Sequence, residues 1–189
     1  VVRTQRVRPR DLAPEERERL YDALYALWQE FIVGMSRDEF VRAQLFEDTR
    51  LHLLFGPSDE LAGFLNFNTY DVDAGGVRRC VLTSSTMSRV QYDAVAAMMR
   101  CGLSECVRIW IRAPFRRLAY LGIATSPISY RSTAAWTARF FPEPGVTPPP
   151  DVEAQMREVM ARRGLPLAKE DPWITSLPRR QREVERILA

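Results

Sequence analysis

Histidine and lysine are almost absent from this sequence, and cysteine is scarce. His52 is the one histidine, Lys169 is the one lysine, and the three cysteines form no Cys-x-x-Cys pair. One histidine and three separated cysteines leave too few ligands for the usual zinc sites, and an odd cysteine count argues against a disulfide framework. We therefore expect no metal site, and a reducing, cytoplasmic location.

Long apolar runs are also missing. No stretch approaches the 18 consecutive apolar residues of a membrane-spanning helix, and no apolar stretch follows the basic N-terminus as it would in a secretory signal. The net charge is only +3, and acidic and basic residues alternate along the chain, so no basic face for nucleic acid is expected. An apolar content of 46% is typical of a folded globular protein.

Helical periodicity marks two segments near the N-terminus. Apolar residues recur at helical spacing between Leu20 and Phe31, and acidic residues follow Pro14 in the first turns. Ser36 and Glu39 have the spacing of a capping box, in which each side chain bonds the other residue's backbone N–H. The sequence therefore predicts one helix over 14–32 and a second that begins after Ser36.

The pattern then becomes strand-like. Strands are predicted over 50–55, 61–71 and 77–83, with turn sequences between them. A helix is expected next over 92–101, ending at Gly102, followed by a segment over 103–111 that fits helix or strand. A buried strand over 118–125 and a helix over 130–141 come after it. A proline-rich break over 142–150 then precedes a last helix, which is capped by Asp151 and closed by Gly164.

This order of elements resembles the GNAT superfamily of N-acyltransferases. In that family a first strand, here 2–7, precedes two helices and a meander of three antiparallel strands. A crossover helix and a parallel fifth strand follow, and 92–101 and 118–125 look like these two elements. The resemblance implies an α/β (α+β) fold with a mixed antiparallel and parallel central sheet flanked by helices. It covers 1–147, and 148–189 is expected to be a helical C-terminal extension packed on or near that domain.

The resemblance also implies an acyl thioester as co-substrate, either acyl-CoA or an acyl-carrier-protein thioester. Family members hold the pyrophosphate of coenzyme A with a Gly-rich loop before the crossover helix. The matching segment here, 84–91, has no glycine, but its hydroxyls and an arginine can still receive an anion; an ordinary capping loop is the alternative. The candidate donor-binding residues are Thr83, Ser84, Ser85, Ser88, Arg89 and Arg131.

Acyl transfer to an amine requires a polarised thioester, a base for the ammonium and an acid for the leaving thiolate. In the family a tyrosine early in the fourth helix often supplies the acid, and Tyr130 occupies a similar position. A packing role is the alternative for Tyr130. The candidate bases are His52 and Asp71, for which a packed histidine and turn chemistry are the alternatives.

Three functions remain open on these residues. The first is an N-acyltransferase that moves an acyl group, of medium or long chain where the pocket is apolar, to an amine of a small molecule or peptide in biosynthesis. The second is a catalytically inactive ligand-binding module on the same fold. The third is an interaction protein whose C-terminal helices hold a partner or a second copy, as in a homodimer.

Overall fold

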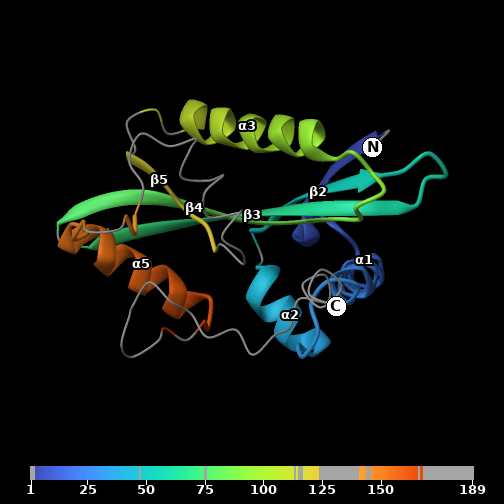
Figure 1. Ribbon diagram of the computed structural model, residues 1–189, viewed down its shortest axis with the longest axis horizontal. Coiled ribbons are helices and arrows are strands. Elements are labelled where there is room, and N and C mark those ends of the chain that lie inside the picture. The colour runs from blue at the N-terminus through green and yellow to red at the C-terminus, as the bar shows by residue number, and fades with distance from the viewer. Residues whose placement is uncertain are drawn as a thin grey trace.

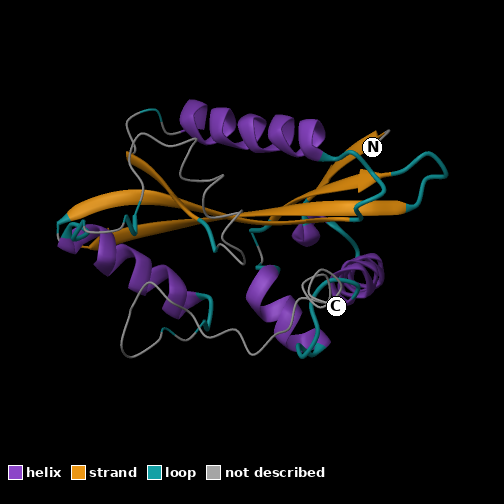
Figure 2. Ribbon diagram, viewed as in Figure 1, coloured by secondary structure: helices purple, strands orange, loops and turns teal. Residues whose placement is uncertain are grey.

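A five-stranded sheet organises the molecule, with the strands in the order β1-β2-β3-β4-β5 (Figures 1 and 2). The computed structural model describes residues 3–46, 48–74, 76–112, 114, 117–123, 141–143, 146–165 and 167. The strands are β1 Arg3–Val7, β2 Arg50–Phe55, β3 Leu61–Ala74, β4 Val77–Ser88 and β5 Arg117–Leu121. The first four are antiparallel neighbours, and β5 pairs with β4 in parallel. The predicted mixed sheet is therefore confirmed.

Helices cover both faces of the sheet. They are α1 Pro14–Gln29, α2 Arg37–Gln44, α3 Val95–Arg112 and α5 Pro150–Arg162, with a short 3-10 turn, η1, at Pro9–Asp11. In Figure 1, α3 lies alone on one face, and α1, α2 and α5 lie on the other. Because strand residues alternate between faces, each strand contributes one set of side chains to the α3 side and one set to the opposite side.

The α1/α2 side holds the largest apolar cluster. Leu24 of α1, Phe40 of α2 and Phe64 of β3 are fully buried within it. The predicted capping box at the start of α2 is confirmed: the Ser36 N–H donates to Glu39 Oε2 at 2.8 Å, and Glu39 N–H donates to Ser36 Oγ at 3.3 Å. The first helix is also confirmed, although it ends at Gln29 rather than at residue 32.

The helix on the other face corrects the prediction for 92–111. The prediction of a helix ending at Gly102 was wrong, because α3 continues through this glycine to Arg112. Gly102 keeps an ordinary negative φ, and the space around it is open. Buried contacts on both sides of the glycine, at Cys101 and Glu105, hold the helix together against the modest cost of an interior glycine.

The strands also differ from the expected bounds. β3 and β4 run further than predicted, to Ala74 and Ser88, because they pair with each other along their whole length. The expectation of a buried fifth strand was wrong for its described part: Leu118 is 43% exposed and Tyr120 is 51% exposed. β5 pairs only with β4, so within the described residues it forms an edge of the sheet.

Helix α5 packs on the sheet at the end of β3 and β4. Val159 is fully buried with Val72 and Val81 of the two strands. Gly164 adopts a φ of +64° directly after the helix, as its closing role requires. Asp151 was predicted to cap this helix, but its side chain forms no cap; it accepts a hydrogen bond from Arg79 at 2.6 Å instead. The helix predicted over 130–141 lies outside the described residues, apart from residue 141.

Candidate active site

The parallel pairing of β4 with β5 stops well before β4 ends. The register runs from Arg79 opposite Arg117 to Thr83 opposite Leu121, whereas β4 continues along β3 to Ser88. Among the described residues, no strand therefore lies beside the outer edge of residues 84–88. We call this edge, together with the end of β5, the fork. A free strand edge presents backbone N–H and C=O groups to any extended ligand.

Hydroxyl groups line the α3 side of the fork. Ser84 lies on this side, two residues beyond Leu82, which pairs with Tyr120. The hydroxyls of Ser84 and Tyr120 are 2.8 Å apart and share a hydrogen bond. Tyr120 is half exposed, so this pair stands at the mouth of the fork and is accessible to a bound molecule.

A buried amide network supports the fork from the opposite face. Asn66 of β3 accepts a hydrogen bond from Ser85 N–H at 2.6 Å and donates to the backbone oxygen of Gln44 at 2.7 Å. The Ser85 hydroxyl donates to Gln44 Oε1 at 2.8 Å. Asn66 and Gln44 are both buried. The network therefore fixes β4 at Ser85 and ties this strand to the end of α2.

The remaining predicted donor-binding residues of β4 lie on both sides of the sheet. Thr83 is buried on the α1/α2/α5 side, and Ser88 is partly exposed at the far end of the strand, opposite Gly63. A Cβ atom at Gly63 would lie 2.6 Å from the Met87 backbone oxygen. The absence of a side chain at this position therefore lets β3 and β4 stay paired to the end of the fork.

The segment between the fork and α3 holds Arg89 in an ion pair. Its guanidinium donates to Glu30, directly after α1, at 2.5 and 2.8 Å and to the Leu61 backbone oxygen at 2.9 Å. The hydrogen bond to Glu30 raises the pKa of Arg89. Helix α3 then begins at Val95 with no acidic residue in its first turn. The free N–H groups of that turn favour an anion.

His52 lies apart from the fork, in a buried ionic cluster under α3. Glu105 is fully buried; Arg50 Nε donates to its Oε2 at 2.6 Å, and His52 Nε2 lies 2.9 Å from its Oε1. Arg6 and Arg108 lie slightly further away, with nitrogen–oxygen distances of 3.7 and 3.8 Å. His52 also packs edge-on against a phenylalanine ring, with centroids 5.5 Å apart. One carboxylate thus balances several cations in the interior.

The cluster strongly stabilises the charged form of Glu105. Burial works to raise the pKa of this carboxyl group, but hydrogen bonds from His52 and Arg50 and the charge of Arg50 outweigh burial and lower the pKa to about 2. Glu105 is therefore ionised throughout the physiological pH range.

The two candidate bases are not brought together. His52 is opposite Leu65 on β3, and Asp71 lies six residues further along that strand. At the usual rise per residue this places them about 20 Å apart. The Asp71 side chain is 47% exposed, 3.9 Å from Arg78. Tyr130 and Arg131, the predicted acid and one predicted donor contact, lie outside the described residues.

Several residues of these sites were not identified by sequence reasoning. Glu105 has one usable signal, because it continues the apolar stripe of Ala97 and Cys101 at a spacing of four. A carboxylate on a buried stripe requires a cationic partner. For Asn66, Gln44 and Tyr120 the linear sequence carries no comparable signal, because their roles depend on which strands and helices meet.

The described part of the chain contains no helix long and apolar enough to cross a membrane. No group of three His, Cys, Asp or Glu side chains in the same residues is close enough to hold a metal ion.

Comparison with known proteins finds similarity at the level of fold. The sequence matches no protein-family model and no curated protein. A probable N-acyltransferase from Enterococcus faecalis V583 aligns with a TM-score of 0.45 and 15% identity, over 69% of this chain but only 31% of its own. A ribosomal-protein-alanine N-acetyltransferase from Brucella melitensis aligns with a TM-score of 0.47 and 10% identity, over 78% of this chain and 99% of its own. An aminoglycoside 6'-N-acetyltransferase from Acinetobacter baumannii aligns with a TM-score of 0.47 and 12% identity, over 78% of this chain and 97% of its own.

Proposed function

We propose that the protein is an N-acyltransferase that binds its acyl thioester along the fork and transfers the acyl group to an amine of a small molecule or peptide. The observation that carries this proposal is the early end of β5: among the described residues, no strand pairs with the outer edge of residues 84–88, which lies beside a helix start. An extended chain with amide groups, such as the pantetheine arm of coenzyme A or of a carrier protein, can pair with a free strand edge as an added strand does.

The proposed reaction forms one bond and breaks another. The amine nitrogen attacks the thioester carbonyl carbon, a C–N bond forms, and the C–S bond breaks. The ammonium gives one proton to a base, and the leaving thiolate takes one proton from an acid. Tyr130 is the proposed acid. The hydroxyl pair of Tyr120 and Ser84 is a second candidate, because it stands at the fork and shares a hydrogen bond of 2.8 Å.

The donor contacts follow from the same geometry. Ser84, Ser85 and Ser88 lie along the fork, where they are proposed to bind the thioester arm. The phosphates of coenzyme A would lie at the start of α3, whose first turn holds no acidic residue, because the first N–H groups of a helix lack intrahelical partners. Arg89 can bind such a phosphate only if its ion pair with Glu30 breaks first. Arg131 and the buried Thr83 keep their predicted roles as proposals.

Of the two proposed bases, Asp71 is the more accessible to an amine. Its side chain is half exposed, although it lies four residues along β3 from Phe67, which pairs with Ser84 at the start of the fork. The His52 ring is buried against Glu105, so an amine has less access to it.

The test is incubation of the purified protein with acetyl-, octanoyl- and palmitoyl-CoA, in the presence of amines, with free thiol and acylated amine measured by mass spectrometry. Tyr130→Phe is expected to lower turnover roughly 100-fold and to leave the fold intact. Tyr25→Phe is the matched control, because it removes a tyrosine hydroxyl that donates to the Met35 backbone oxygen on α1's side of the sheet. Failure of every acyl thioester to bind contradicts the proposal.

A second candidate is a ligand-binding module without catalytic activity. The ion pair of Arg89 with Glu30 and the lack of glycine in 84–91 favour it, because both weaken the usual phosphate contact. Under this alternative the protein binds an acyl thioester without releasing thiol, whatever amine is supplied. Light scattering of the full chain and of a chain ending at residue 147 tests the third possibility, a homodimer held by the C-terminal extension.

A further inference from the structure

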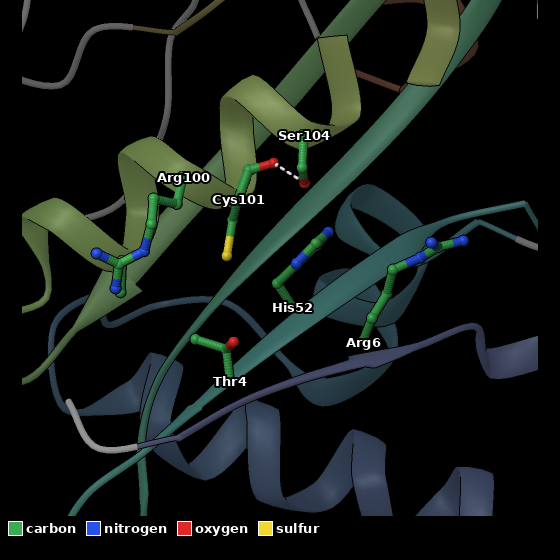
Figure 3. A pocket seen from close by; sticks show the side chains of 7 residues that line it. Thr4, Arg6, His52, Arg100, Cys101 and Ser104 are labelled. Carbon is green, nitrogen blue, oxygen red and sulfur yellow. Dashed lines mark hydrogen bonds between the residues drawn. The ribbon is translucent and has the colours of Figure 1, made fainter. Parts of the chain in front are cut away.

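A pocket opens between α3 and the edge of the sheet formed by β1 and β2. Its volume is about 320 Å³, which is within the size range of small-molecule sites. The lining residues are Thr4 and Arg6 of β1, His52 of β2, and Ala97, Arg100, Cys101 and Ser104 of α3. Figure 3 shows the side chains of α3 facing those of the two strands, with the Cys101 sulfur directed toward the sheet.

Positive charge dominates this pocket and the layer beneath it. Arg6, Arg50 and Arg108 form ion pairs with the single carboxylate of Glu105 and with no other acidic residue among those described. Arg100, at the pocket, has no ion pair or hydrogen bond with the described residues. Three guanidinium groups thus share one carboxylate, a fourth at the pocket has no ion pair with the described residues, and the local excess of positive charge is not neutralised by the described part of the protein.

Two independent features agree with this excess. Burial, and next the charge of Arg108, lower the pKa of Arg6 although Glu105 is nearby, so Arg6 experiences a net positive surrounding. The Nη2 atom of Arg50 is buried and has no hydrogen-bond partner within the described part of the chain. An anion bound in the pocket would stabilise the charged form of Arg6, which lines it.

The pocket has two cationic ends, and both apolar and hydroxyl-bearing side chains lie between them. In Figure 3, Arg100 and Arg6 lie at opposite sides of the view, with Thr4, His52 and Cys101 between them. Ala97 and Cys101 supply apolar surface, and Thr4 and Ser104 supply hydroxyls. We propose that this pocket binds a small organic dianion, with a carboxylate or phosphate at each end of a short apolar body. Guanidinium groups suit both kinds of oxyanion.

This site is separate from the fork. The buried side chains of Leu65 and Phe67, covered by α3, fill the space between them. The proposal does not depend on acyl transfer, so loss of thioester binding leaves it standing. Because the ligand bridges β1 and α3, its occupancy also holds in place the helix whose first turn borders the fork.

The experiment is calorimetric titration of the full chain, without any acyl donor, with glutarate and with pentanoate at matched ionic strength. Both have five carbons, but only glutarate carries two carboxylates. Glutarate is expected to bind roughly tenfold tighter than pentanoate, and Arg100→Gln is expected to weaken glutarate binding by about tenfold or more. Arg100 is exposed and unpaired within the described residues, so this variant should fold normally.

Arg157→Gln on α5 is the control, because Arg157 is a half-exposed arginine paired only with Glu153 within the described residues. It should leave glutarate binding unchanged. An arm with inorganic phosphate tests whether one end alone binds a tetrahedral oxyanion, with the same dependence on Arg100. The proposal is overturned if glutarate does not bind, if pentanoate binds equally well, or if Arg100→Gln and Arg157→Gln have equal effects.

Discussion

The two sides of α3 handle polar groups in different ways. On the β1/β2 side, ionised groups are buried around Glu105 and held by charge-assisted hydrogen bonds. On the β4/β5 side, the fork carries neutral hydroxyls and a free strand edge, supported from behind by the amides of Asn66 and Gln44. Both sides are covered by α3, but only the β1/β2 side contains buried charges whose exposure or removal would cost stability.

This difference suggests a division of roles. A buried ionic cluster fixes the position of α3, because moving the helix would separate Glu105 from Arg50 and His52. Neutral hydroxyls at the fork can exchange partners with a ligand at small cost, and its outer edge pairs with no other described strand. The chain therefore combines a rigid side, which positions α3, with an adaptable side, which is suited to binding.

Removing the charge of Glu105 should have the largest effect on stability. Glu105→Gln leaves Arg50 buried beside a neutral amide, and loss of one member of a buried pair typically costs about 3–5 kcal/mol. Urea unfolding followed by circular dichroism measures this change. The control is Glu158→Gln on α5, which removes a partly exposed i,i+4 partner of Arg162 and should cost roughly 0.5 kcal/mol or less. Equal effects of the two substitutions would contradict the rigid-side account.

The contribution of Glu105 should also depend on pH. Its pKa is about 2 in the folded protein against an ordinary 4.5, so the unfolded chain binds the proton first as the pH falls. The stabilisation is complete above pH 4.5 and is lost progressively toward pH 2, with a total of roughly 3 kcal/mol. Unfolding free energies of wild type and Glu105→Gln, compared at several pH values, should converge in this window. A constant difference would be incompatible with the lowered pKa.

Removing the amide that supports the fork should have an intermediate effect. Asn66→Ala deletes the acceptor for Ser85 N–H and the donor to Gln44, which leaves buried polar groups without partners. The expected cost is about 1–3 kcal/mol in chemical denaturation. Thioester affinity should fall as well, because β4 loses its fixed position at Ser85. Loss of stability with unchanged thioester binding would separate this network from the fork.

A pair of glycines provides the most local test, and Gly102→Ala has the smallest expected effect. Gly63→Ala places a Cβ 2.6 Å from the Met87 backbone oxygen at the end of the fork and should cost about 1–3 kcal/mol. Gly102→Ala lies in open space in the middle of α3, with no positive φ, and should stabilise the protein by about 0.5–1 kcal/mol. Thermal unfolding of both variants measures this. A stability change of the same sign in both variants would contradict the local geometry described at one of the two glycines.

Local patterns in the sequence predict most of the described elements. Alternation identified β2, and the Ser36 capping box identified the start of α2, because these signals depend on neighbouring residues. The length of α3 was missed, since Gly102 is a helix-ending signal locally and is overruled by contacts that only the folded chain makes. The ionic cluster was missed for the same reason: His52 and Glu105 are 53 residues apart and meet only because α3 crosses over β2.

The most direct test of the central proposal is amide hydrogen exchange with and without octanoyl-CoA, followed by mass spectrometry. We predict slower exchange in peptides covering Ser84–Ser88 and the first turn of α3, with little change in β1 and β2. Tyr130→Phe should retain this protection while turnover falls, because it alters the proposed acid and leaves the fork in place. Absence of protection at residues 84–88 in the presence of a bound acyl thioester, or protection confined to β1 and β2, would contradict the account.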